Sequence, residues 1–120
     1  MSNTTRIIAD LAENGGGTYD ALNLQPVTWT TGFAVAIGGV QISADDATPT
    51  RIASAVRMVK SEWMTPFVGT WRGGGTVYVD AVEYIRDPGR AKARGRDANQ
   101  LSIYDFATGE VVWLVSEEQE

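Results

Sequence analysis

Residues 67–85 constrain the fold of this chain most, because two strand-like segments flank the glycine run 73–75. Val77 and Val79 fall on one face of the second segment, since successive side chains of a strand point to opposite faces. Glycines readily adopt the positive φ angles of a tight turn, and no helix start follows them, which disfavours a phosphate-binding loop. The alternation blurs after Asp80 and predicts a β-bulge there. We therefore expect an antiparallel hairpin over this stretch.

Three other segments have helical patterns. Residues 4–13 place aliphatic side chains on one face, and a glycine run follows them. The clearest pattern follows Pro49, where apolar residues recur at spacings of three and four and predict a buried stripe. This stripe consists of Ile52, Ala55, Val56, Val59 and Trp63. The third helix is expected to begin after the capping residue Asp87, and the residues on its apolar face are all small.

The remaining segments favour β-structure. Residues 27–43 are rich in strand-forming residues, and Gly38 with Gly39 predicts a hairpin turn within them. A brief strand is expected at 18–21, and a closing strand pair at 101–115.

Taken together, the pattern helix-strand-strand occurs three times and predicts an α+β fold. We expect a single domain over residues 1–120, with an antiparallel sheet built from successive hairpins. Two or three helices are expected to pack mainly on one face of that sheet. The acidic tail 116–120 is expected to be frayed.

The chain contains no cysteine and no histidine, which excludes most catalytic classes. Disulfides, thiolate nucleophiles, Cys/His zinc sites and histidine-based triads all require one of these residues. The net charge of −5 argues against broad binding to nucleic acid, and no apolar run approaches the ~20 residues of a membrane span. The N-terminus lacks the pattern of a signal peptide. We therefore expect a cytoplasmic protein that is not an enzyme and uses no cofactor.

Strand carboxylates offer one alternative to that expectation. Asp80, Glu83 and Asp105 are predicted on strands, where carboxylate oxygens could hold Mg²⁺ or act as an acid–base pair. Nothing in their spacing is specific for a metal. Solvent exposure or pairing with arginine is the favoured interpretation for all three.

A basic segment follows the central hairpin. It holds five of the ten positive charges of the chain: Arg86, Arg90, Lys92, Arg94 and Arg96. Such a cluster can bind phosphates or an acidic partner, although a solvated helix surface is favoured.

The aromatic residues exceed what a small core requires. Trp63 and Trp71 are expected in the core, whereas Trp29 and Trp113 are expected to face outward. Exposed Trp, Tyr and Arg side chains supply much of the binding energy at protein interfaces, so these two tryptophans are candidate binding residues.

Three stretches carry a resemblance to a known group of proteins: GFAVAIGG at 32–39, VGTWRGGGTVYVD at 68–80 and DANQLSIYDFATGEVVWL at 97–114. Together they resemble small uncharacterised proteins encoded by phages of actinobacteria. The resemblance implies a phage accessory protein in the cytoplasm of an infected bacterium, and it brings no catalytic residues with it. Gly89 and Gly95 depart from the pattern, because better helix formers are expected there.

We therefore expect a non-catalytic binding or accessory protein that acts on another protein, in host takeover or in evading host defence. The alternative is a Mg-dependent enzyme or nucleotide-binding protein that uses the strand carboxylates. A homodimer is also expected, because an open sheet exposes unpaired edges. The candidate edges are 111–115, which is continuously apolar, and 27–30.

Overall fold

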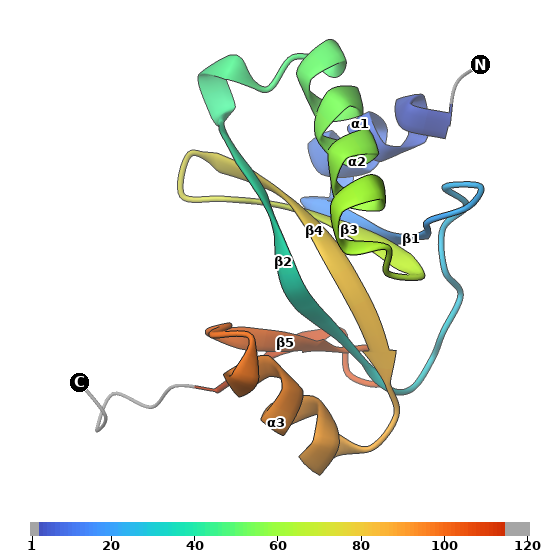
Figure 1. The fold of residues 1–120 in the computed structure, drawn as a ribbon, viewed down its shortest axis with the longest axis vertical. Helices are drawn as coiled ribbons and strands as arrows, with labels where there is room; N and C mark the ends of the chain where they lie inside the picture. The colour runs from blue at the N-terminus through green and yellow to red at the C-terminus, as the bar shows by residue number, and fades with distance from the viewer. Residues whose placement is uncertain (1–2, 115–120) are drawn as a thin grey trace.

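The computed structural model describes residues 3–114 and contains three α-helices packed against one six-stranded antiparallel sheet (Figure 1). The expected α+β class is therefore confirmed. In chain order the elements are α1 (Asn3–Asn14), β1 (Gly16–Asp20), β2 (Phe33–Ser43), the 3₁₀ turn η1 (Ala44–Asp46), α2 (Pro49–Trp63), β3 (Phe67–Gly73), β4 (Thr76–Ile85), α3 (Pro88–Asp97), β5 (Ser102–Asp105) and β6 (Glu110–Trp113). The predicted tail 116–120 and the last residue of the predicted edge strand, 115, lie outside the described residues.

The predicted central hairpin is present as β3 and β4. Gly74 and Gly75 form its two-residue turn with φ angles of 60° and 77°, the positive values that the tightest hairpin turns require. The strand order is β1-β3-β4-β2-β5-β6, so this hairpin lies within the sheet and not at an edge.

The expectation that every strand pair is a hairpin is wrong for the first pair. β1 pairs with β3, whereas β2 pairs with β4 on the other side of the central hairpin. No turn forms at Gly38 and Gly39, because β2 runs through both residues as one strand of eleven residues. Residues 27–30 form no strand either, and the edge that they were expected to provide is β1.

The predicted bulge lies in the neighbouring strand and not in β4. The register between β2 and β4 shifts between Ala36 and Gly38, so Ile37 is the extra residue. β4 pairs with β3 without interruption. The pattern of β4 blurs after Asp80 because Ala81 and Val82 are both buried, one on each face of the sheet.

All three helices cover the same face of the sheet. Val77 and Val79 of β4 join the core cluster that α1 and α2 complete, and Glu83 of β4 binds Arg94 of α3. These three β4 residues have odd numbers in an unbroken strand, so their side chains share a face. The expectation of helices mainly on one face is therefore confirmed.

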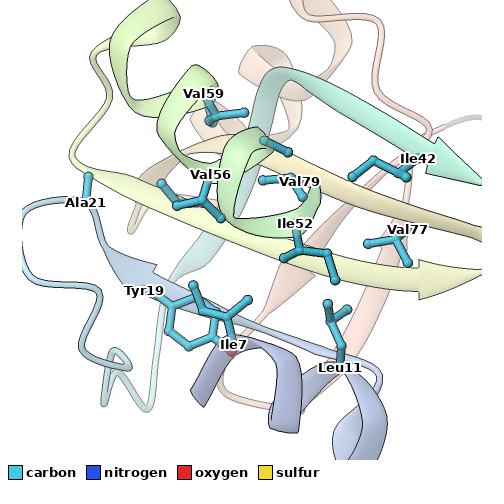
Figure 2. Close-up of a cluster of buried hydrophobic side chains, with 13 residues drawn as sticks. Ile7, Leu11, Tyr19, Ala21, Ile42, Ile52, Val56, Val59, Val77 and Val79 are labelled. Atoms are coloured by element: carbon cyan, nitrogen blue, oxygen red, sulfur yellow. The ribbon is translucent and has the colours of Figure 1, made fainter. Parts of the chain in front are cut away.

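The core beneath α1 and α2 is aliphatic apart from the buried ring of Tyr19 (Figure 2). Figure 2 shows Ile52, Val56 and Val59 of α2 in one cluster with Val77 and Val79 of β4. The predicted stripe of α2 is confirmed for its four aliphatic members, which are all buried. Trp63 is only partly buried at the C-terminal end of the helix.

Trp63 explains why β2 has a glycine at position 38. A Cβ atom placed on Gly38 would clash with the indole nitrogen of Trp63. The ring therefore lies directly on the backbone of β2. A hairpin turn at this glycine would remove the surface on which α2 ends.

A second, smaller core lies beneath α3. Asp87 caps this helix through a 2.8 Å hydrogen bond from the Arg90 amide, and Pro88 occupies its first turn, as predicted. Ala91 and Gly95 are buried against the sheet. A Cβ atom on Gly95 would lie 2.5 Å from Leu114 Cδ1, so glycine is needed here for close packing.

The two glycines of α3 should therefore respond in opposite ways to alanine. A Cβ atom on Gly89 would contact only the exposed Asp87 carboxylate, at 3.3 Å. Gly89→Ala should therefore raise the free energy of unfolding by about 0.4–1 kcal/mol through helix propensity. Gly95→Ala gains the same propensity but overpacks the core, with a net loss of about 1–2 kcal/mol. Urea unfolding of both variants measures this, and a stabilising Gly95→Ala would contradict the close packing of α3.

Candidate functional site

We call the face of the sheet that no helix covers the helix-free face. Along each strand, its residues alternate with the residues whose side chains point to the helices. Register assigns to it the following residues: Gly16, Thr18, Asp20, Ala34, Ala36, Gly39, Gln41, Ser43, Phe67, Gly69, Trp71, Gly73, Thr76, Tyr78, Asp80, Val82, Tyr84, Ser102, Tyr104, Val111 and Trp113. The segment 22–32 joins β1 to β2 and packs along part of this face (Figure 1).

Trp29 fixes the segment 22–32 to the sheet. Its ring stacks on Tyr84 at 3.9 Å and meets Phe67 and Phe106 edge-on at 4.5 and 5.2 Å. Tyr84 also donates a 2.7 Å hydrogen bond to the Thr31 carbonyl. Such aromatic pairs stabilise a protein beyond the area they bury. Trp29 is therefore half-buried and anchors the segment 22–32 to the sheet. The expectation that it faces outward is wrong.

The other tryptophans of the helix-free face are exposed. Trp113 is 69% exposed on β6, which confirms its predicted outward position. Trp71 is 51% exposed, so its expected place in the core is wrong. The reason is register: Trp71 pairs with Tyr78 on the face that no helix covers.

Asp80 lies in the middle of the same face, on the central strand β4. Its neighbours across the two adjacent strands are Gly39 and Gly69, so no side chain stands beside it on either strand. Burial raises the pKa of the Asp80 carboxyl from 3.8 to about 7. Within residues 3–114 its carboxylate accepts no hydrogen bond and forms no ion pair. Asp80 is only partly exposed, and a desolvated carboxylate without a partner is rare and costs stability.

The other two predicted carboxylates do not join Asp80. Glu83 points to the helix side, where it binds Arg94 Nε at 2.9 Å. The Asp105 carboxylate accepts a 2.9 Å hydrogen bond from the Ala107 amide. Asp105 pairs with Phe33, which lies six residues, or about 20 Å, along β2 from Gly39, the partner of Asp80. Across residues 3–114, no three metal-binding side chains gather in one place. This set therefore forms no common Mg²⁺ site.

The five basic residues do not form one patch. Ala91 and Gly95 face the sheet, so Arg90 and Arg94 lie on one flank of α3, and Lys92 and Arg96 lie on the other. Arg94 is paired with Glu83. Arg86, Arg90 and Arg96 are exposed. This arrangement fits the predicted solvated helix better than a phosphate site.

A shallow depression of about 260 Å³ lies beside Trp29 and Phe67, at the start of the segment 22–32. Asp20 lines this depression, and its carboxylate accepts a 2.8 Å hydrogen bond from the Leu22 amide. Asn23 accepts the Gln25 amide at 2.9 Å. These polar groups hold the turn, so the depression offers little free chemistry.

The sequence reasoning missed Trp71, Gly39 and Gly69 as features of this site. Glycine inside a strand can signal close backbone approach, and that signal was present at both positions. This signal does not identify the residue that approaches the glycine, because the pairing of β2 with β4 is not visible in the sequence.

Comparisons with family models, curated proteins and solved structures find no match to this chain. No helix within residues 3–114 is both long and apolar enough to cross a bilayer. Functional inference therefore depends on the chemistry of the helix-free face.

Asp80 should make stability fall as pH rises. Its folded pKa lies above the unfolded value, so the native state holds more protons between about pH 4 and 7, and stability decreases through that range. Asp80→Asn should remove this loss. Its stabilising effect should be larger at pH 8 than at pH 4.5 by roughly 2 kcal/mol, allowing for partial exposure.

Urea unfolding at several pH values measures this difference. Asp45→Asn, which removes a carboxylate from the exposed turn η1, is the control and should leave the pH dependence unchanged. An Asp80→Asn effect of equal size at both pH values would mean that Asp80 is ordinarily solvated.

Proposed function

We propose that this protein is a non-catalytic binding protein that engages a partner protein through the helix-free face of its sheet. The observation that carries the proposal is the exposure of large aromatic side chains on that face: Trp71 at 51%, Tyr104 at 37% and Trp113 at 69%. Tryptophan and tyrosine are the residues that most often dominate protein interfaces. Single exposed apolar residues are common, but these stand on one uncovered sheet face.

Ring contacts join Tyr104 to other aromatic residues on this side of the sheet. Tyr104 meets Phe106 edge-on at 5.0 Å, and Phe106 in turn contacts Trp29. The aromatic row from Tyr104 through Phe106 to Trp29 is therefore held rigid before any partner binds. Rigid aromatic side chains lose little conformational entropy on association, which favours binding.

The biological setting belongs to the same proposal. The resemblance to phage proteins supports an accessory role in the cytoplasm of an infected bacterium, in host takeover or in evading host defence. The alternative, a Mg-dependent enzyme or nucleotide-binding protein, has less support, because Asp80, Glu83 and Asp105 do not converge.

Truncating the exposed tryptophans should weaken partner binding without unfolding the protein. Trp71→Ala and Trp113→Ala should each reduce capture of a partner from an actinobacterial lysate by about tenfold or more, as expected for interface hot spots. Met58→Ala is the matched control, because Met58 is also 51% exposed but lies on α2. Partners retained equally by all three variants would place the binding surface elsewhere.

The sheet edge at β6 supports self-association as part of this proposal. Within residues 3–114, β6 pairs only with β5, and its outer edge carries Trp113. Unpaired edges without Lys or Pro readily accept another strand.

A homodimer should therefore have twice the 13.0 kDa chain mass by light scattering at micromolar concentration. Trp113→Glu should shift it to monomer, because the new charge would be buried in the interface. Met58→Glu, on the opposite side of the sheet, should leave the dimer intact. A wild-type monomer would exclude self-association, and a dimer that tolerates Trp113→Glu would use another surface.

A further inference from the structure

We infer that Asp80 receives a cationic side chain, lysine or arginine, that the partner inserts into the gap above Gly39. This inference rests on the proposed function, because it names the chemistry that the partner must present to the helix-free face.

The gap is defined by missing side chains. Asp80 pairs with Gly39 on β2 and with Gly69 on β3. A Cβ atom on Gly39 would clash first with the Val79 carbonyl oxygen of β4 and would lie 2.7 Å from Asp80 Oδ1, so the β4 backbone and the carboxylate both approach this glycine closely. Gly39 is exposed, whereas Gly69 is buried and has Val82 Cγ2 against it. The carboxylate is therefore closed off toward β3 and open toward β2.

Among the described residues 3–114, no positively charged strand residue on the helix-free face neutralises Asp80. The only other charged strand residue assigned to this face is Asp20 on β1, and its carboxylate holds the Leu22 amide. The segment 22–32 contains no charged residue. The remaining titratable groups on the face are the hydroxyls of Tyr78, Tyr84 and Tyr104. The face is thus negative, and every arginine and lysine in the described strands and helices lies elsewhere.

The lack of a cation beside Asp80 has an energetic cost. Removing a carboxylate from water without a partner is costly, and the raised pKa of Asp80 expresses that cost. A cation placed beside the carboxylate would restore its charged form and supply a charge-assisted hydrogen bond. A metal ion fits less well, because a single carboxylate supplies too few of the oxygen ligands that Mg²⁺ or Ca²⁺ requires.

Aromatic rings next to the gap favour the same occupant. Trp71 and Tyr78 form a cross-strand pair one same-face position away from Gly69 and Asp80. The Trp71 indole leans away from the gap, since its Nε1 would lie 3.0 Å from a Cβ atom on Gly73. Lysine and arginine side chains bind favourably over such rings. Tyr78 is the aromatic neighbour of Asp80 on the same face of β4, and Trp71 lies farther from the gap, where it can contact the rest of the partner.

The test uses a small cation and its neutral isostere. Nα-acetyl-arginine methylamide is titrated into the ¹⁵N-labelled full-length protein at pH 8, and Nα-acetyl-citrulline methylamide is titrated at matched ionic strength. We expect the arginine probe to shift the amide signals of Gly39 and Asp80, with about tenfold weaker binding by citrulline. Lowering the pH to 5.5 should weaken arginine binding, because Asp80 becomes protonated.

Two variants make the result specific. Asp80→Asn keeps the size and polarity of the side chain and should weaken arginine binding about tenfold. Asp20→Asn removes the other carboxylate of the face and should leave binding unchanged. Equal shifts from arginine and citrulline, unchanged binding by Asp80→Asn, or shifts centred on Asp20 would each overturn the inference.

The inference and the proposed function fail separately. Arginine binding at Asp80 without any tryptophan-dependent partner would keep the cation site and remove the proposed function. A partner that depends on Trp71 but binds Asp80→Asn as tightly as the wild type would keep the function and remove the cation site.

Discussion

The pairing of β2 with β4 is the interaction on which the rest of the structure depends. These two long strands run through both halves of the molecule: β1, β3, α1 and α2 assemble at one end, and α3, β5 and β6 at the other. The bulge residue Ile37 lies between the two core clusters and packs against both. The register of β2 against β4 therefore decides which side chains face the helices in both halves.

Two adjacent glycines of β2 serve opposite faces at this point. Gly38 lets the Trp63 ring of α2 rest on the strand, and Gly39 leaves room for the Asp80 carboxylate. A side chain at position 38 would collide with the Trp63 ring, and one at position 39 would collide first with the Val79 carbonyl of β4 and then with the Asp80 carboxylate. The close approach of α2 and the open gap at Asp80 thus have the same origin, a stretch of β2 that carries no side chains.

The concentration of all three helices on one face has a direct functional consequence. Among residues 3–114, the opposite face is covered in part by the segment 22–32, anchored by Trp29, and by Phe106 of the β5–β6 turn. Aromatic rings and a lone, partly exposed carboxylate remain there, with no cation of the described strands to balance the charge. A desolvated charge without a partner lowers stability, so its presence on the face that no helix covers favours a role in binding.

Local patterns in the sequence were sufficient for elements whose partners are close along the chain. The triple glycine predicted the β3–β4 turn, the spacing from Ile52 to Val59 predicted α2, and Asp87 with Pro88 predicted the start of α3. Each depends on turn geometry, helical periodicity or capping, which act within a few residues. Tertiary structure alone decided that β2 pairs with β4, that Gly38 and Gly39 lie inside a strand, and that Trp71 is exposed while Trp29 is an anchor. Strand order and register arise from contacts between residues far apart in the chain, and the environment of Asp80 is set by these contacts, so no local pattern could predict it.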